Sequence, residues 1–457
     1  MSDDGKPLRV AIVGSGPSGF YAAEALLASG LDVEIDLLER LPVPYGLVRF
    51  GVAPDHAKLK SVSAVFAQIA ADPKLRFFGN VALGRDVSAD ELAAMYHAVI
   101  VACGAGADRT LGIPGEDLPG VHAAGDFVGW YNGSPDHAHL AFDLSQEVAV
   151  VIGQGNVAID VCRILARPVD ELRRTDIAQH ALDALARSRI RDIHLVGRRG
   201  PVQAKFTPKE LRELGTLPGW QPVVDPAALE PGEACRRELA LPGVVHAAKN
   251  LDILRGFAAR PMEAERRIHL HFLRAPAALH GDERVRRIAL AGQQLSGEPG
   301  AQSAVETGEQ IELDAGLVFR SVGYRGTALP GLPFDARAGV IPNAGGRIVD
   351  AAGQPLPGWY VTGWIKRGPT GVIGTNRADS MDTVAGLLQD VSGLAAPRPG
   401  RQALLALLES RSHRVIDFAG WQAIERVEKA RGQALDKPAD KFVRIDDMLA
   451  AAHGAPP

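Results

Sequence analysis

Short, mostly apolar runs alternate with segments whose apolar residues recur at helical spacing, and this alternation is typical of an α/β fold. The first run, Leu8–Val13, leads through a glycine-rich turn to a helical pattern that starts near Gly19 and stops near Gly30. A second run, Val33–Leu38, ends at Glu39. We expect these segments to form a β-α-β unit of about 30 residues within a parallel sheet.

A second unit with the same succession begins at Glu147. Val148–Ile152 is expected to be a strand, Ile159–Leu165 a helix and Ile193–Val196 the next strand. Further strands and helical segments are expected at Ala98–Ala102, Gly316–Val322 (a strand returning to the first domain), Trp359–Trp364, Asn376–Leu388 and Leu404–Leu408. The region from residue 226 to residue 300 shows little periodicity and is expected to be rich in loops.

The order of the two units predicts that one domain is inserted into the other. Residues 1–107 and 327–457 are expected to form the first domain, with residues 397–457 as an appendage packed on it. Residues 108–326 are expected to form the second domain. A chain of 457 residues is long enough for two or three domains.

The first glycine-rich turn has the spacing G-x-G-x-x-G, formed by Gly14, Gly16 and Gly19, with Ser18 inside it. The three glycines permit a tight turn, a close approach of the backbone to a pyrophosphate, and close packing of helix on strand. The helix N-terminus then offers N–H groups to the phosphates. Glu39 ends the second strand, where a carboxylate binds ribose hydroxyls and repels a 2′-phosphate.

The second unit carries the related pattern G-x-G-x-x-A, again between a strand and a helix. Its residues are Gly153, Gln154, Gly155, Asn156, Val157 and Ala158. Arg198 and Arg199 end the following strand, where the first unit has an acid. Guanidinium groups bind phosphate in a bidentate manner, so this pair favours the 2′-phosphate of NADP, although an exposed basic turn is the alternative.

Two dinucleotide sites of different charge in one chain predict electron transfer between two cofactors. FAD in the first domain and NADPH in the second is the simplest pairing, because a flavin accepts a hydride and releases single electrons. The fold class predicted is therefore α/β, with two Rossmann-like dinucleotide-binding domains and the NADP domain inserted into the FAD domain.

Composition excludes several other classes. The cysteines, Cys103, Cys162 and Cys235, form no C-x-x-C pair, so we expect no disulfide framework, no iron–sulfur cluster and no metal site. The formal net charge of −4 argues against a nucleic-acid-binding protein. No apolar run reaches the roughly 18 residues that a membrane span needs. The short polar segment before residue 8 does not have the pattern of a signal or transit peptide.

The sequence resembles the adrenodoxin reductase type of ferredoxin–NADP reductase, over residues 8 to about 390. The segments that carry the resemblance are Val13–Phe20, Val43–His56, Gly79–Val81, Gly84–Val87, Phe127–Gly133, Ile152–Asp160, Val196–Pro201, Phe206–Glu213 and Thr362–Ile373. The resemblance implies a two-domain enzyme that passes a hydride from NADPH to non-covalently bound FAD and then single electrons to a ferredoxin-type iron–sulfur protein. The absence of a transit peptide and the polar tail after Pro397 are expected of a bacterial, cytoplasmic member, and we expect a monomer.

Carried over position by position, the resemblance adds cofactor contacts beyond the glycines, the acid and the arginines. The expected FAD contacts are Ser18, Glu39, Leu47, Leu83, Trp364, Gly371, Val372 and Ile373. The expected NADP contacts are Gln154, Gly155, Asn156, Val157, Arg198, Arg199 and Glu210, with Gly371 near both cofactors. Hydride transfer needs the two reacting atoms at roughly 3–3.5 Å with water excluded, so no catalytic triad is expected.

His56 and Asp160 are the candidate catalytic residues, because the resemblance places their equivalents near the junction of flavin and nicotinamide. We expect them to position the nicotinamide and handle protons. Each also has a structural interpretation of equal weight. Asp160 would lie in the first turn of a helix, where an acid is favourable, and His56 would begin a helix after Pro54-Asp55.

The partner is expected to be an acidic ferredoxin, which would dock on basic residues of the inserted domain. The candidates are Arg236, Arg237, Arg266 and Arg267. Three alternatives remain: an NADPH-dependent flavin disulfide or quinone reductase, an electron-input subunit of a larger synthase, and a non-catalytic nucleotide-binding redox sensor. Lack of a close cysteine pair disfavours the first, and lack of cluster-binding cysteines disfavours the second.

Two further patterns are interpreted as loops without a site. Ala124-Gly125-Asp126 resembles a glycine–aspartate pair that meets FAD in many flavoproteins, but no clear strand precedes it. His137 and His139 stand next to Asp136 with H-x-H spacing, yet no third group of ligands follows, so a solvated loop is favoured over a metal site.

Overall fold

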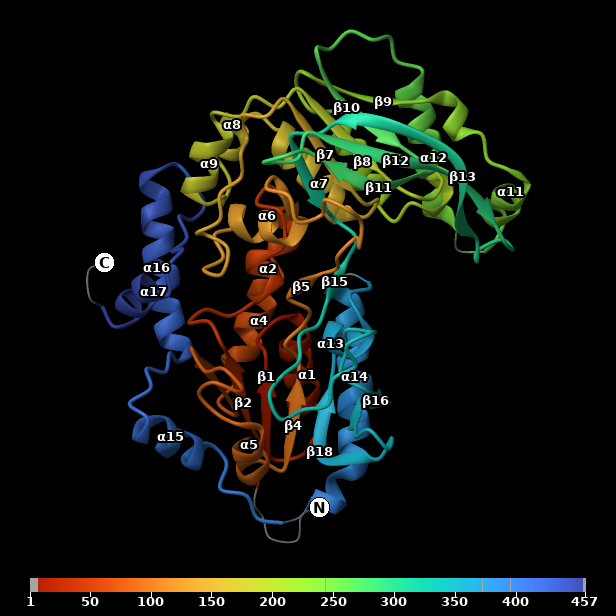
Figure 1. The fold of residues 1–457 in the computed structure, drawn as a ribbon. Helices are drawn as coiled ribbons and strands as arrows, with labels where there is room; N and C mark the ends of the chain where they lie inside the picture. Colours follow the sequence, from red (N-terminus) through yellow and green to blue (C-terminus); the bar gives the residue numbers. More distant parts are fainter. Residues whose placement is uncertain (1–6, 243, 372, 395, 455–457) are drawn as a thin grey trace. The chain divides into compact units, whose positions relative to one another are not determined.

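The computed structural model describes residues 7–454 except residues 243, 372 and 395. The chain divides into two compact units (Figure 1). The first unit consists of Met1–Ala107, Asn132–Pro135 and Gly323–Pro457, and the second of Asp108–Tyr131 and Asp136–Val322. Most of the second unit is thus an insertion between two parts of the first. A short two-stranded sheet pairs β5 (Ala107–Asp108) with β15 (Tyr324–Arg325).

A seven-stranded sheet forms the centre of the first unit. In spatial order its strands are β16 (Asn343–Ala344), β17 (Arg347–Val349), β18 (Pro355–Val361), β4 (Ala98–Val101), β1 (Leu8–Val13), β2 (Val33–Glu39) and β3 (Leu75–Gly79). The five strands from β18 to β3 are parallel, and β16 and β17 add an antiparallel edge. Strand β1 is apolar except at Arg9 because both of its faces are covered: Val10 and Ile12 pack in one core, Ala11 and Val13 in another.

The helices of the first unit pack on both faces of this sheet. They are α1 (Pro17–Leu27), α2 (Leu47–Phe50), α3 (Ala57–Lys60), α4 (Ser63–Ala70), α5 (Ala89–Met95), α13 (Trp364–Arg367), α14 (Ile373–Asp390), α15 (Arg401–Ser410), α16 (Phe418–Ala434) and α17 (Ile445–Ala452), with a 3₁₀ turn η3 at Val391–Leu394. Helix α14 packs along α1, although the two are far apart in sequence (Figure 1).

The C-terminal segment contributes to the core of the first unit. Trp421 and Ile424 of α16 and Met448 of α17 are buried in the same apolar cluster as Val10 and Ile12 of β1. Before α16, Ile416 forms an antiparallel bridge with Gly79 at the end of β3. These helices therefore complete the apolar core that begins with the first strand of the chain.

The second unit has a six-stranded sheet in which all strands are parallel. Its spatial order is β6 (Val121–Ala123), β14 (Leu317–Arg320), β7 (Val148–Ile152), β8 (Asp192–Val196), β10 (Arg266–His271) and β9 (Trp220–Val224). A separate antiparallel sheet contains β11 (Arg274–His280), β12 (Arg287–Ser296) and β13 (Ser303–Asp314). The helices are α6 (Ala124–Tyr131), α7 (Asn156–Ala166), α8 (Val169–Leu172), α9 (Gln179–Leu185), α10 (Pro208–Leu214), α11 (Glu233–Leu239) and α12 (Val245–Ala258), with 3₁₀ turns η1 (Pro201–Gln203) and η2 (Pro226–Leu229).

Three expectations about local structure were wrong. Ala124-Gly125-Asp126 is no loop: it begins helix α6, directly after strand β6. The strand at residues 317–320 pairs with β6 and β7, so it belongs to the sheet of the second unit and the chain returns to the first unit only afterwards. Residues 226–300 are not mainly loops, because they contain α11, α12, β10, β11 and β12.

The predicted fold class is confirmed, since both units are α/β and each contains a Rossmann-like β-α-β unit with a parallel sheet. Across the part of the chain that the structure describes, none of the helices is both long enough and apolar enough to cross a membrane.

Candidate nucleotide-binding sites

Each glycine in the glycine-rich turn of the first unit has a different structural reason. Gly14 has a φ of +110°, and a Cβ there would lie 2.6 Å from the carbonyl oxygen of Ala102. A Cβ on Gly19 would lie 1.9 Å from the carbonyl oxygen of Gly14. A Cβ on Gly16 would meet no atom of the chain within 4 Å. Gly14 and Gly19 are therefore required by packing, whereas Gly16 borders open space where a ligand can approach the backbone.

Glu39 faces this turn from the end of β2. Its Oε2 accepts hydrogen bonds from the N–H (3.1 Å) and the hydroxyl (2.8 Å) of Ser15, and its Oε1 accepts one from the N–H of Leu41 (3.1 Å). The carboxylate is thus held beside the N-terminus of α1, whose N-cap Gly16 provides no side-chain cap. An acid in this position suits the ribose hydroxyls of a nucleotide that lacks a 2′-phosphate.

The loop before α2 closes over the same turn. Tyr45 has a φ of +84°, which is uncommon for a residue with a side chain, and its N–H donates to the carbonyl of Ser15 at 3.0 Å. A Cβ on Gly46 would lie 3.1 Å from the Cα of Gly16. Leu47 follows at the start of α2 and is 38% exposed, so its side chain is available for a ligand contact. Leu83 is buried in the core, so its expected contact would have to come from its backbone.

The segment after β18 packs on the turn from the other side. Gly363 has a φ of +78°, and a Cβ there would lie 2.2 Å from the hydroxyl of Ser18. Its N–H donates to Asp379 Oδ2 at 2.6 Å, and Asp379 also pairs with Lys366 Nζ at 2.8 Å. No sequence motif indicates Asp379, because its partners Gly363 and Lys366 lie 16 and 13 residues away in the chain.

Trp364, the first residue of α13, supplies a buried indole N–H that has no hydrogen-bond partner within the described residues. Its ring stacks on that of Tyr324 with 5.9 Å between centroids. A buried donor without a partner fits a residue that bonds to a ligand. Gly371, with a φ of +82°, and Ile373 stand at the start of α14, and Val372 lies outside the described residues.

The turn of the second unit repeats this geometry. Gly153 has a φ of +143°, and a Cβ there would lie 2.1 Å from the carbonyl oxygen of Ser321, whereas a Cβ on Gly155 would meet nothing within 4 Å. Ala158 is completely buried where the first turn has Gly19. The side chain of Gln154 lies over Gly197, where a Cβ would be 1.8 Å away. The second turn therefore has the same packed first glycine and the same open second position.

Charge distinguishes the two sites. Arg198 and Arg199 follow β8 directly, and Arg198 is exposed while Arg199 is half-buried. Within the described part of the chain neither guanidinium has an ion pair or a side-chain hydrogen bond. The position that holds the carboxylate of Glu39 in the first unit therefore holds two cations in the second, of which Arg199 also lies within electrostatic reach of Glu238. Two guanidinium groups at this position suit a 2′-phosphate.

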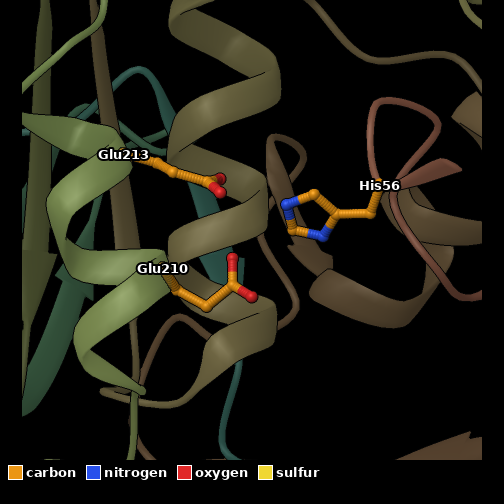
Figure 2. Close-up of side chains that lie close together, drawn as sticks. All are labelled: His56, Glu210 and Glu213. Carbon is orange, nitrogen blue, oxygen red and sulfur yellow. The ribbon is translucent and has the colours of Figure 1, made fainter. Parts of the chain in front are cut away.

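Asp160 of α7 forms an ion pair with Arg163 Nη2 at 2.6 Å, and the Arg163 side chain is fully buried. Arg163 Nε is also 3.3 Å from Glu213 Oε2. Glu210 and Glu213 project in the same direction from α10, whose N-cap is Thr207 (Figure 2). Asp160 therefore has a structural role in pairing with a buried cation, beside the catalytic role that the sequence suggests.

His56 belongs to the first unit, where it is the N-cap of α3 and is also labelled in Figure 2. Its side chain is buried, with 8% exposed. The N–H groups of Leu59 and Lys60 donate to its carbonyl oxygen. The histidine thus begins a helix, as the structural interpretation expected.

Comparison with known proteins assigns the chain to a family. The family model described as pyridine nucleotide-disulphide oxidoreductase matches residues 8–196. NADPH-ferredoxin reductase FprA of Mycobacterium tuberculosis is 47% identical over 458 residues, which cover 97% of this chain and 99% of FprA. The mitochondrial NADPH:adrenodoxin oxidoreductase of Homo sapiens is 45% identical over 466 residues, covering 98% and 93% of the two chains. A solved structure of Mycobacterium tuberculosis FprA in complex with NADPH matches with a TM-score of 0.92 and 46% identity, over 98% of this chain and 100% of that one.

The chain belongs to the adrenodoxin reductase-type ferredoxin–NADP reductases. The family predicted from the sequence is confirmed, and the match extends through the C-terminal helices.

In this family member the candidate docking arginines lie in two places. Arg236 and Arg237 are on α11, which packs against η1, the turn that follows the C-terminal end of β8. Arg266 and Arg267 are the first residues of β10 and so lie at the N-terminal end of that parallel strand, and Arg266 lies over the ring of Trp220 at 5.9 Å. The four residues therefore form two separate basic pairs within the second unit.

Proposed function

We propose that the chain is an NADPH-dependent ferredoxin reductase that binds FAD in the first unit and NADPH in the second. The observation that carries this proposal is the contrast between two turns of the same geometry. One turn has the carboxylate of Glu39 at the ribose position and the other has Arg198 and Arg199. The printed functions of the relatives, NADPH-ferredoxin reductase and NADPH:adrenodoxin oxidoreductase, support the same assignment.

The flavin, when bound, accepts a hydride and releases electrons singly. The residues of the chain bind the two cofactors and orient them. In the first unit, Gly16 and the N-terminus of α1 receive the pyrophosphate, and Glu39 accepts hydrogen bonds from the ribose. The indole N–H of Trp364 donates to the flavin side of the site, which satisfies a donor that is otherwise buried without a partner.

In the second unit, Gly155 and the N-terminus of α7 receive the pyrophosphate of NADPH. Arg198 and Arg199 bind its 2′-phosphate, and Glu210 makes a further contact with NADPH. Asp160, held by Arg163, and His56 position the nicotinamide and handle protons at the site. Electrons then pass to an iron–sulfur protein outside this chain.

The visible spectrum of the purified protein tests the cofactor and the reaction together. We expect flavin absorption bands that NADPH bleaches much faster than NADH under anaerobic conditions. A variant with both Arg198 and Arg199 changed to alanine should keep the flavin bands and lose most of the preference for NADPH, because only the 2′-phosphate distinguishes the two donors. A colourless protein, or bleaching at equal rates by the two donors, would overturn the proposal.

We further propose that the ferredoxin is acidic and docks on one of the two basic pairs. Charge reversal at Arg236 and Arg237, and separately at Arg266 and Arg267, distinguishes them. Charge reversal at the pair that docks should lower the rate of ferredoxin reduction at low salt by roughly ten-fold or more. Added salt should abolish this difference between the variant and the unaltered protein. Bleaching by NADPH alone should not change. If neither reversal alters the salt dependence, the basic docking surface is refuted.

The disulfide reductase alternative finds no support in the thiols. None of the three cysteines forms a disulfide, and Cys162 and Cys235 are buried while Cys103 is exposed. We propose that the protein works in the cytoplasm, where its three cysteines would stay reduced. We propose that it is a monomer, which size-exclusion chromatography with light scattering tests directly.

A further inference from the structure

Helix α14, which packs along α1 (Figure 1), buries polar side chains on one of its faces. Asn376, Ser380 and Thr383 are 7%, 0% and 0% exposed, and the side chain of Asp379 is 10% exposed. These residues are three or four positions apart, so they lie on the same side of the helix. A helix in a core normally buries apolar residues on that side. The hydrogen-bond partners of this polar face lie in β18, in the segment that follows it and in the first glycine-rich turn.

Asp379 is the centre of the polar face. Its Oδ2 accepts hydrogen bonds from the N–H of Gly363 at 2.6 Å and from the hydroxyl of Thr362 at 3.0 Å. Its Oδ1 lies 2.8 Å from Lys366 Nζ. Trp364, whose buried indole N–H has no partner within the described residues, lies between these contacts in the chain. One carboxylate therefore holds the turn from β18 into α13 on both sides of Trp364.

The neighbours of Asp379 on α14 extend this support in two directions. The hydroxyl of Ser380 donates to the carbonyl oxygen of Ser18, inside the first glycine-rich turn, at 3.0 Å. Asn376 Oδ1 accepts from Arg367 Nη2 at 2.7 Å, and Arg367 Nη1 also donates to Thr370 Oγ1 at 3.1 Å. The polar face thus connects the glycine-rich turn on one side with the loop after α13 on the other.

The same carboxylate balances two cations. Asp379 lies 2.8 Å from Lys366 Nζ and 3.7 Å from Arg367 Nε, and the two cationic side chains are 14% and 20% exposed. Within the described residues no other acid pairs with either cation. Lys366 Nζ also donates to Thr383 Oγ1 at 3.0 Å, which keeps the ammonium group on the polar face. Without Asp379, two uncompensated positive charges would remain beside Trp364, where exclusion of water strengthens their effect.

We infer that Asp379 is a positioning residue of the flavin site, which fixes the turn that carries Trp364 and balances the charge of Lys366. A flavin gains negative charge when it is reduced, and nearby cations stabilise that charge. Asp379 therefore limits this stabilisation and keeps the reduction potential of the bound FAD low, as a donor of electrons to an iron–sulfur protein requires. The inference rests on the proposed function and deepens it, because it concerns the same site.

The midpoint potential of the bound flavin, measured by reductive titration against a reference dye without NADPH, tests the charge. Asp379→Asn should raise the potential, because it keeps an acceptor for Gly363 but leaves Lys366 and Arg367 uncompensated. Lys366→Met should lower the potential, and Asp379→Asn/Lys366→Met should return it close to the value of the unaltered protein. Asp382→Asn is the matched control and should cause no shift, because Asp382 is exposed on α14 and has no ion pair within the described residues.

Dissociation of FAD from the flavin-containing protein, followed by the rise of flavin fluorescence on dilution, tests the positioning. Asp379→Ala should release FAD roughly ten-fold faster than the unaltered protein, because the N–H of Gly363 and the hydroxyl of Thr362 lose their acceptor. Asp382→Ala, the control, should release FAD at the unaltered rate. Thermal unfolding shows whether each variant is folded, and the downward shift expected of Lys366→Met remains measurable if the Asp379 variants do not fold.

Potentials that are unchanged in both Asp379→Asn and Lys366→Met would overturn the inference. Release of FAD from Asp379→Ala at the same rate as from Asp382→Ala would overturn it as well. The failure of the proposed function is seen differently, as bound flavin that NADPH bleaches no faster than NADH does. A potential that depends on Asp379 and Lys366 is measured without NADPH and would stand in that case.

Discussion

The ion pair between Arg49 and Glu428 connects the loop over the first glycine-rich turn with the C-terminal helix α16. Arg49 Nη2 lies 2.6 Å from Glu428 Oε1, and the two side chains are 9% and 2% exposed. The Arg49 guanidinium also lies 5.1 Å from the ring centroid of Trp421. Glu428 Oε1 accepts the N–H of Phe442 at 2.9 Å as well. Removal of Arg49 would leave a carboxylate uncompensated in the core.

Breaking a buried pair by removing one partner costs about 3–5 kcal/mol, against a total stability of about 5–15 kcal/mol for a typical domain. We expect Arg49→Met to lower the free energy of unfolding by that amount. In Arg49→Met/Glu428→Gln the glutamine still accepts from Phe442 and no charge is buried, so the double variant should recover at least about 1 kcal/mol relative to the sum of the single losses. Because Arg49 is in α2, next to Leu47, the single variant should also release FAD at a lower urea concentration.

Urea titration followed by flavin fluorescence and circular dichroism measures both effects. Lys429→Met is the matched control, since Lys429 pairs with Glu425 on the same helix at 3.0 Å with side chains 56% and 38% exposed. Solvent screens that pair, so the control should lose no more than about 0.5 kcal/mol. Additive single losses in the double variant, or a control loss as large as that of Arg49→Met, would refute the reasoning.

Three further predictions concern the second unit. Gly155→Ala should leave the melting temperature unchanged, because the added Cβ meets no atom of the chain, but should weaken NADPH binding at least ten-fold, because the Cβ occupies the space of the ligand. Gly153→Ala should destabilise the fold, because its Cβ would lie 2.1 Å from a carbonyl oxygen. Calorimetric unfolding and NADPH binding titrations distinguish the two effects. Burial lowers the pKa of His194 to about 3 and that of His271 to about 4 from an ordinary 6.5. Unfolded histidines therefore bind protons that the folded ones do not, and urea midpoints should fall as the pH drops from 6.5 to about 4, less steeply in His194→Gln; a pH-independent midpoint in this window would contradict the burial argument. Asp160→Asn should slow flavin reduction by NADPH in stopped-flow if the carboxylate is catalytic, and an unchanged rate with lower stability would assign it to the ion pair with Arg163 alone.

The sequence predicted best those elements that are buried on both faces. Strands β1, β7 and β8 agree with the predicted runs to within about one residue, because a central parallel strand is covered on both faces and is therefore mostly apolar. Strand β13 shows why others were missed. It is exposed along nearly its whole length, so its sequence lacks the alternation that identifies a strand. Helix α6 was missed because it is short and contains two glycines, which disfavour a helix locally.

The residues of the candidate sites also divide into those that the sequence predicts and those that it does not. Glycines, the acid and the arginines follow from local spacing, and the structure places them at the ends of the expected strands. Contacts between distant segments had no local signature. Asp379 supports Gly363, and Glu238 orients Gln203 from 35 residues away, but neither acid belongs to a motif. The two basic pairs also show that residues grouped from the sequence can lie on different elements, one pair on helix α11 and the other at the start of β10.

The insertion of one unit into the other has a consequence for biosynthesis. The core of the first unit needs both β1, made first, and α16 and α17, made last, so it cannot close until nearly the whole chain has left the ribosome. The sheet of the second unit is complete once β14 has emerged at residue 320. At about 5–20 residues per second, the remaining 137 residues take roughly 7–27 seconds to synthesise. We therefore expect the sheet of the second unit to form during translation, whereas the core of the first unit closes only after α16 and α17 have emerged.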